Sequence, residues 1–224
     1  MIINEIFYSL QGEGSLLGVP SVFVRVAGCP LRCKWCDTKY AWDKSAGEEM
    51  SIEAIAEKVL AFEVRHVVVT GGEPLVNDEL ISLIDAIDDP SLHITIETSG
   101  IEYVGGLKCD LMSISPKLSN SVEADSGEKP EVEPLNINAM QRLIDEYDYQ
   151  IKFVVDSPDD LDEIAGVIAK LENINPYKIM LMPQASTKVE YVKKLPMVAE
   201  IAKNTGFALS PRLQVELWGN SKGK

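Results

Sequence analysis

The alternation of strand-like and helix-like segments is the feature that most constrains how this chain can fold. A β-rich run at 21–27 is followed by a cysteine-rich loop and then by further strand and helix patterns at 51–60, 66–70, 77–87, 92–98, 111–115, 137–147, 151–155, 158–171 and 178–182. Such alternation implies parallel strands with helices outside them. About six units are too few to close an eight-stranded barrel. We therefore expect a single α/β domain, residues 1–224, built as an open, partial (β/α)6-like barrel.

Local signals refine this expectation. Ser51, Asn77 and Ser157 stand where helix N-caps are expected, and Pro196 should interrupt the last long helix. Strands are expected at 207–210 and in the tail at 213–217. The acidic segment 119–135 has no aromatic residues, which favours a surface loop, with an active-site lid as the alternative.

Composition excludes several classes of function. The 21 Lys and Arg residues against 35 Asp and Glu give a net charge of −14, so we expect no nucleic-acid partner. No apolar run is long enough for a membrane span, and the start of the chain lacks the cationic region of a signal peptide. These features predict a cytoplasmic protein. In that reducing compartment, the four cysteines are better candidates for ligands or catalysts than for disulfides.

Three of the cysteines form a compact loop directly after the first predicted strand. Cys29, Cys33 and Cys36 have C-x3-C-x2-C spacing, and three thiolates so placed can hold three irons of a [4Fe-4S] cluster while leaving the fourth iron open. Zinc is the alternative metal, but a structural zinc site needs four ligands, and neither histidine has zinc-finger spacing from the loop. Cys109 stands apart and is expected to be a small buried hydrophobe.

Polar residues near the predicted strands suggest a substrate pocket. Gln11 and Glu13 are spaced by glycine and offer an amide and a carboxylate to a ligand with donor and acceptor groups; a plain glycine-rich turn is the alternative. Arg25 interrupts an apolar strand, and a buried cation needs an anionic partner, for which a substrate carboxylate is suitable. The alternative for Arg25 is a side chain that points outward in a half-buried strand.

The cysteine loop, with Trp35 before its last cysteine, resembles the signature of the radical S-adenosylmethionine (SAM) superfamily. The segment Gly71-Gly72-Glu73-Pro74 at a strand end is similar to the superfamily motif that lines the methionine amine of SAM. This resemblance implies that SAM binds the open iron. It also implies that an electron from the cluster cleaves SAM to methionine and a 5′-deoxyadenosyl radical.

Four further segments resemble the 7-carboxy-7-deazaguanine synthase family: 10–14, 36–38, 115–117 and 217–220. The resemblance implies a lyase that converts 6-carboxy-5,6,7,8-tetrahydropterin to 7-carboxy-7-deazaguanine with loss of ammonia, in queuosine and 7-deazapurine biosynthesis. It further implies a requirement for Mg2+, a homodimer and an electron donor such as flavodoxin. Relatives often carry a histidine where Gln214 stands, so an acid–base role at this position is in doubt.

The same resemblance assigns residues to three groups. It implies that the substrate is bound by Leu10, Gln11, Gly12, Glu13, Arg25 and Thr70. SAM would be contacted by Trp35, Cys36, Asp37, Gly72, Glu73, Ser115, Pro116, Lys117 and Gln184. The metals would be held by Cys29, Cys33 and Cys36 for the cluster and by Thr38 for Mg2+. A turn or cap is the alternative role for Thr38.

Two other functions fit parts of the pattern. An activating enzyme that makes a glycyl radical on a protein partner shares the cysteine spacing but does not explain the 10–14 segment. An iron–sulfur electron carrier without catalysis would not need the glycine-rich strand end at 71–74.

Overall fold

A computed structural model describes residues 1–87, 89–122, 129–219 and 221–224. Its strands form one open nine-stranded sheet in the order β3-β1-β2-β4-β5-β6-β7-β8-β9. The strands are β1 (Ile2–Leu10), β2 (Pro20–Val26), β3 (Glu48–Glu49), β4 (His66–Gly71), β5 (His93–Thr98), β6 (Leu111–Ile114), β7 (Tyr149–Val155), β8 (Ile179–Pro183) and β9 (Ala208–Leu209). The helices are α1 (Ile52–Leu60), α2 (Leu80–Ala86), α3 (Ile137–Glu146), α4 (Asp160–Ile168), α5 (Lys188–Thr205) and α6 (Leu213–Trp218).

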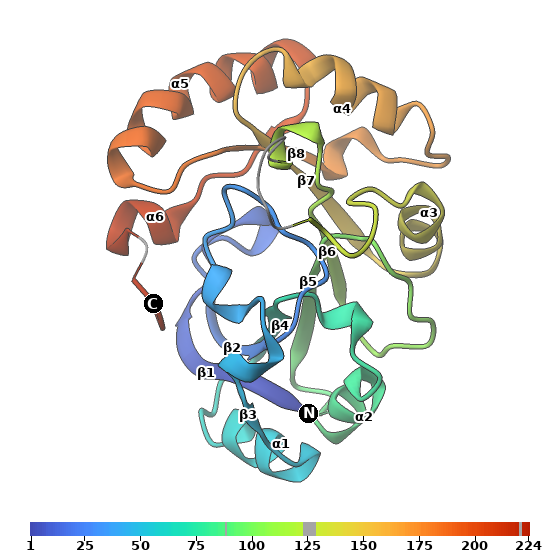
Figure 1. The fold of residues 1–224 in the computed structure, drawn as a ribbon, viewed down its shortest axis with the longest axis vertical. Helices are drawn as coiled ribbons and strands as arrows, with labels where there is room; N and C mark the ends of the chain where they lie inside the picture. The colour runs from blue at the N-terminus through green and yellow to red at the C-terminus, as the bar shows by residue number, and fades with distance from the viewer. Residues whose placement is uncertain (88, 123–128, 220) are drawn as a thin grey trace.

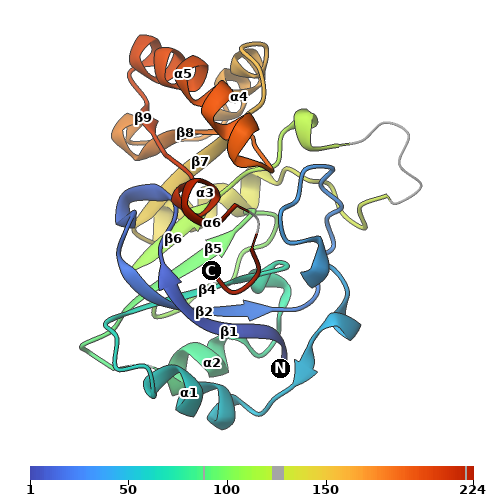
Figure 2. The same cartoon turned by 90° about the vertical axis from the view of Figure 1, so that its left-hand side faces the viewer.

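The expected open α/β architecture is confirmed. From β2 through β4 to β9, each strand is parallel to the next one in the sheet, whereas β1 is antiparallel to both of its neighbours, β2 and β3. Helices α1 to α5 lie around the outside of the sheet (Figure 1), and Figure 2 shows α1 and α2 at one end of the molecule and α4 and α5 at the other. No helix in the described ranges has both the length and the apolar character that a membrane span requires.

The first strand was missed by the sequence patterns. Residues 2–10 form β1, so the cysteine loop follows the second strand rather than the first. The polar pair Asn4 and Glu5 breaks the apolar pattern there, and the register shifts between Ile3 and Glu5 at a bulge. Strand β1 joins β2 through residues 11–19, which places the glycine-rich segment beside the sheet.

Helix starts were predicted with mixed success. The Ser51 side chain accepts a hydrogen bond from the Ala54 amide, which confirms this N-cap. The predictions for Asn77 and Ser157 are wrong. Each closes a turn just before the helix, accepting from the amides of Glu79 and Asp159 respectively, and the helices begin at residues 80 and 160.

Two features of the C-terminal part also differ from expectation. Helix α5 continues through Pro196. Proline has no amide hydrogen to donate to the carbonyl of Val192, but both residues lie on the exposed face of the helix, where water can bond that carbonyl instead. Residues 213–217 form helix α6 instead of a strand. Their alternating pattern is too short to separate the two structures: Val215 is fully buried, while Leu217, on the same face of the expected strand, is 52% exposed.

One row of polar side chains crosses the otherwise apolar sheet. Arg25 on β2 is in register with Thr70 on β4, while Glu97 on β5 is in register with Ser113 on β6, which in turn is in register with Gln150 on β7. Strand β7 is buried along its whole length. A parallel sheet covered on both faces normally carries continuous apolar runs, so the polar row marks the face on which a site is built.

Candidate active site

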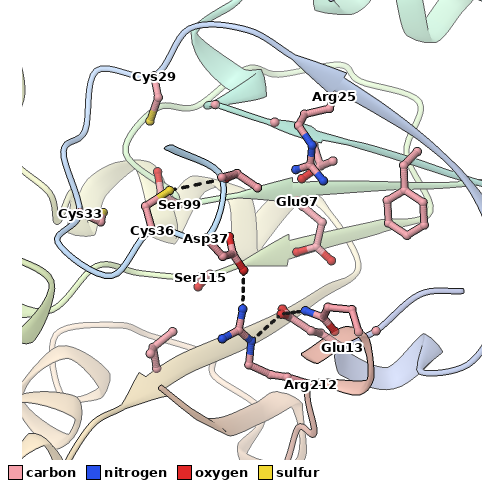
Figure 3. Close-up of a pocket in the computed structure, with 18 of the residues that line it drawn as sticks. Glu13, Arg25, Cys29, Cys33, Cys36, Asp37, Glu97, Ser99, Ser115 and Arg212 are labelled. Carbon is pink, nitrogen blue, oxygen red and sulfur yellow. Dashed lines mark hydrogen bonds and ion pairs between the residues drawn. The ribbon is translucent and has the colours of Figure 1, made fainter. Parts of the chain in front are cut away.

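A single cavity at the carboxyl ends of the strands gathers nearly every predicted site residue (Figure 3). Pro116 is the exception, because it is buried and does not line the cavity. The predicted residues that line it are Leu10, Gln11, Gly12, Glu13, Arg25, Cys29, Cys33, Trp35, Cys36, Asp37, Thr38, Thr70, Gly72, Glu73, Ser115, Lys117 and Gln184, and Gln214 lines it as well.

The cysteine loop is held by backbone contacts on two sides. The amides of Gly28 and Cys29 donate to the carbonyls of Ala41 and Trp42, both at 2.9 Å. On the other side the Lys34 amide donates to the carbonyl of Ser121 at 2.9 Å, and the Trp35 indole donates to the carbonyl of Asn120 at 3.0 Å. The three thiols are therefore presented to the cavity by a fixed main chain.

The glycine-rich strand end at 71–74 docks onto this loop. The amide of Gly72 donates to the carbonyl of Val26 and that of Glu73 to the carbonyl of Gly28, both at 3.0 Å. A Cβ atom on Gly72 would lie 2.0 Å from the Gly28 carbonyl oxygen, so only glycine allows this approach. The Glu73 carboxylate is buried and accepts from the Thr98 hydroxyl at 2.6 Å and the Ser99 amide at 2.8 Å, which ties the ends of β4 and β5 together.

The donor set of the loop fits an iron–sulfur cluster. All four cysteines are free. Burial raises the pKa of the Cys29 thiol to about 12 and raises that of Cys33, so each needs a bound cation to become the thiolate that ligates metal. Within residues 1–87, 89–122, 129–219 and 221–224, no three His, Cys, Asp or Glu side chains converge closely enough for one metal ion. This spacing gives no support to the zinc alternative.

Arg25 points into the cavity, which contradicts the outward-pointing alternative. Its Nε donates to Glu5 Oε1 at 2.7 Å, and the Tyr40 hydroxyl donates to the same oxygen at 3.0 Å. The guanidinium carbon lies 5.6 Å from the centre of the Phe7 ring. Glu5 is thus a partner within the chain that the sequence patterns missed. The described residues provide no hydrogen-bond partner for the two terminal nitrogens of Arg25.

Glu13 lies in a network of charges on the opposite side of the cavity (Figure 3). Its carboxylate accepts from Lys152 at 2.9 Å, from Arg212 at 3.2 Å and from Gln214 at 2.7 Å. Burial alone would raise the pKa of Glu13, but the cations Lys152 and Arg212 lower it to about 2. Glu13 is therefore a permanent anion, and the glycine-rich segment is more than a plain turn.

Gln214 is the tail residue for which an acid–base role was in doubt. Its Nε2 donates to Glu13, and its Oε1 is buried without a partner among the described residues. A Cβ atom on Gly12 would lie 1.9 Å from that oxygen, so a side chain at position 12 would displace the Gln214 amide from this place. This amide cannot act as an acid or base, and it leaves one acceptor for a ligand.

Sequence reasoning missed five charged residues of the site: Glu97, Lys152, Arg212 and Lys224, which line the cavity, and Glu5, which holds Arg25. Lys152 interrupts the apolar strand 149–155 just as Arg25 interrupts 20–26, so the same signal could have found it. Glu97 interrupts β5 similarly. Arg212, which ion-pairs with both Glu13 and Asp37, lies outside any strand or helix and gave no such signal.

The predicted SAM-binding residues occupy the other end of the cavity. The Lys117 ammonium donates to the Ser115 hydroxyl at 2.9 Å and lies 5.9 Å from the Trp35 ring centre. Gln184 Oε1 accepts from Lys194 at 2.6 Å. Thr38 occupies the N-cap position of a short 3-10 turn (Lys39–Ala41), but its side chain caps nothing there, and its hydroxyl lies 3.5 Å from the Cys36 sulfur.

Three predictions concern residues outside this cluster. Cys109 is half-buried and packs against the main core, as expected of a small hydrophobe. Within the predicted loop 119–135, residues 123–128 lie outside the described residues, so its function as a lid is not tested. Asn220 of the tail motif also lies outside them.

Comparison with known proteins assigns the chain to a class. Residues 23–116 match the Radical SAM superfamily, so the cavity with its thiol loop belongs to a radical SAM enzyme, a class that uses a [4Fe-4S] cluster and SAM.

Relatives that match nearly the whole chain define its family. A 7-carboxy-7-deazaguanine synthase from Rhodopirellula baltica is 40% identical over 100% of this chain and 88% of its own length. The synthase from Halobacterium salinarum is 38% identical over 98% of this chain and 91% of its own length. The crystal structure of QueE from Escherichia coli superposes with a TM-score of 0.73 at 28% identity, covering 95% of this chain and 93% of that one. The chain belongs to the 7-carboxy-7-deazaguanine synthase family.

Proposed function

We propose that this chain converts 6-carboxy-5,6,7,8-tetrahydropterin, with loss of ammonia, to 7-carboxy-7-deazaguanine, the product for which its relatives are named. One observation carries the proposal beyond family membership. The cavity beside the thiol loop presents the guanidinium of Arg25, whose terminal nitrogens have no partner among the described residues, and two carboxylates, Glu13 and Glu97. A carboxylated aminopyrimidine has the complementary groups: an anion and an edge of N–H donors.

The residues of this chain would then divide the recognition between them. The terminal nitrogens of Arg25 bind the substrate carboxylate, for which Glu5 and Tyr40 hold the guanidinium in place. Glu13 already accepts three hydrogen bonds and keeps room for about one more. The unpartnered Gln214 Oε1 accepts a further N–H of the substrate.

The cofactors would be held on the other side of the cavity. Cys29, Cys33 and Cys36 ligate the cluster, and SAM lies against Trp35, Gly72, Ser115, Lys117 and Gln184. When bound, this pair supplies the electron and the 5′-deoxyadenosyl radical that start the reaction. The polypeptide binds and orients the pterin.

Thr38 would contribute to a Mg2+ site. Its hydroxyl makes no capping bond and lines the cavity. Mg2+ prefers a few protein oxygens completed by water and substrate oxygens. We expect Thr38→Ala to raise the Mg2+ concentration needed for half-maximal turnover, measured by titrating Mg2+ at fixed pterin, whereas turnover that needs no Mg2+ in the unmutated enzyme would remove this assignment.

A homodimer and a flavodoxin-like electron donor complete the proposal, and both follow from the family resemblance. Analytical ultracentrifugation of the reconstituted enzyme tests the first. The rate of SAM cleavage with reduced flavodoxin in place of a chemical reductant tests the second.

The decisive experiment is anaerobic turnover of reconstituted protein with reductant, SAM, Mg2+ and 6-carboxytetrahydropterin. We expect the ultraviolet spectrum of a deazaguanine to appear together with ammonia. A glycyl-radical activating enzyme would cleave SAM without making either product, and an electron carrier would not cleave SAM.

A further inference from the structure

Lys152 is a buried lysine that joins two acidic residues of the cavity. It lies in the middle of β7, and its side chain is 1% exposed. Its Nζ donates to Glu13 Oε2 at 2.9 Å and to Glu97 Oε2 at 2.8 Å. A buried ammonium is costly unless it is paired and hydrogen-bonded, and here both of its recorded partners are carboxylates of the substrate pocket.

The two carboxylates depend on Lys152 to different extents. Glu13 also accepts from Arg212 and Gln214, so it keeps a cation if Lys152 is removed. Glu97 has one other described donor, the neutral amide of Gln11 at 3.2 Å. Lys152 is therefore the only cation that the described residues place in hydrogen-bond contact with Glu97.

The position of Lys152 explains how both acids can face one cavity. Glu97 comes from β5 and Lys152 from β7, and Ser113 of the intervening strand β6 is in register with Glu97. Ser113 is small and fully buried, and its hydroxyl accepts from the Gln150 amide at 2.8 Å, while Lys152, two residues further along β7, reaches past it to Glu97. Two neighbouring carboxylates without a cation between them would repel, and one would take up a proton.

We propose that Lys152 is a positioning residue that offsets the repulsion between Glu97 and Glu13 and holds Glu97 turned toward the pterin, so that both carboxylates together accept from the donor edge of the aminopyrimidine. This inference rests on the proposed function. Lys152 acts only through the two carboxylates and does not touch the substrate. Burial alone would lower the pKa of the Lys152 ammonium, but the nearby carboxylates of Glu97 and Glu13 raise it above the ordinary value of lysine, which agrees with this arrangement.

Other charges line the same cavity and must be considered in any pH dependence: Arg25, Asp37, Glu73, Lys117, Arg212 and Lys224. Arg212 pairs with Glu13 and Asp37, Arg25 with Glu5, and Lys117 donates to Ser115. Glu73 is satisfied by Thr98 and Ser99. None of the described side chains provides a second cation in contact with Glu97, so loss of Lys152 should affect Glu97 first.

The test measures pterin affinity as a function of pH in the reconstituted holoenzyme. For Lys152→Met we expect affinity for 6-carboxytetrahydropterin to fall about tenfold or more at pH 6 relative to the unmutated enzyme and to recover at pH 9, because two carboxylates without the cation between them share a proton at the lower pH. SAM affinity and the cluster spectrum should not change. Lys152→Arg should keep the normal pH profile, and Lys203→Met, the same substitution at an exposed lysine, serves as the control.

An infrared difference spectrum gives a readout that needs no substrate. Lys152→Met should show the band of a protonated carboxyl group at pH 6, and the band should be absent from Lys152→Met/Glu97→Gln. If the unmutated enzyme does not bind the pterin, the proposed function fails, but the infrared test of Lys152 still stands.

Two outcomes would overturn the inference: an affinity loss for Lys152→Met that is the same at every pH, or no protonated carboxyl band. If Lys152→Met does not fold, the double variant, which removes one charge of each sign, should restore folding; a double variant that folds no better than the single one also overturns it.

Discussion

At the scale of single residues, the thiols of the cysteine loop must lose their protons before they can ligate metal. Because burial raises the pKa of Cys29 to about 12, metal binding must displace a proton, which makes cluster assembly pH-dependent and less favourable in acid. Replacing Cys29, Cys33 or Cys36 by Ala should abolish the cluster absorbance and reductive SAM cleavage. Cys109→Ala is the matched control because Cys109 is also partly buried but packs against the core. A cluster that survives Cys33→Ala and is lost in Cys109→Ala would reverse the assignment.

Arg25 allows a thermodynamic test of substrate recognition. Losing one partner of a desolvated charge pair typically costs about 2–5 kcal/mol, so Arg25→Ala should weaken pterin binding by roughly thirtyfold or more, as measured by calorimetry under anaerobic conditions. A tetrahydropterin without the carboxylate should lose a similar amount with the unmutated enzyme and little more with Arg25→Ala. Additive losses would show that Arg25 serves Glu5 and the fold instead.

Some residues of the site could be predicted from the sequence and others could not. Arg25 was found because a cation in an apolar strand demands a partner, and the same reasoning would have found Lys152. The partner itself could not be predicted, since Glu5 faces Arg25 only after the bulge in β1 sets the register. Arg212 is 199 residues from Glu13, and nothing local in the sequence indicates that the two meet.

At the scale of elements, the strand end at 71–74 serves the cysteine loop directly. Gly72→Ala would force a Cβ atom to within 2.0 Å of a backbone oxygen, so we expect loss of cluster binding and a lower melting temperature. Gly166 is the control: it lies inside α4 with open space around its Cα, so Gly166→Ala should stabilise the enzyme by about 0.5–1 kcal/mol. Cluster absorbance and thermal unfolding measure both effects. A Gly72→Ala variant with a normal cluster would show that the loop does not need this contact.

Elements with a regular apolar pattern were predicted better than elements without one, for a physical reason. Strands β4 and β5 and helices α1 and α3 carry several apolar residues in register with their own period, so their patterns are unambiguous. Helix α6 has six residues, and its conformation is set by tertiary contacts such as the bond from the Leu213 amide to the Gly12 carbonyl at 2.9 Å. No local pattern encodes a contact of that kind.

At the scale of the whole molecule, the opposite end of the sheet carries a pH-sensitive group. His66 is buried between Ser21 and Thr95, and burial, with nearby His93, lowers its pKa to about 4. In the unfolded chain His66 takes up a proton near its ordinary pKa of 6.5, whereas in the folded chain it does so only near pH 4. The stability that neutral His66 contributes is therefore complete above about pH 6.5 and is lost as the pH falls toward 4. The difference between these two pKa values corresponds to about 3 kcal/mol in the free energy of unfolding.

Urea unfolding at several pH values checks this expectation. The free energy of unfolding should fall between pH 7 and pH 5 in the unmutated protein and fall less in His66→Gln, which cannot titrate. Equal slopes for the two proteins would assign the pH dependence to other groups.

The ion pairs of Glu13 have a consequence for how the enzyme is made. Its partners Lys152, Arg212 and Gln214 follow it by 139, 199 and 201 residues. Since domains emerge from the ribosome N-terminal end first, the segment around Glu13 is synthesised long before any of these partners exists. A nascent chain must keep that acid in water until almost its last helix has left the exit tunnel. The proposed pterin pocket is therefore completed at the end of biosynthesis, and ribosome-stalled chains that expose residues only up to about 200 should carry the cysteine loop yet bind no pterin.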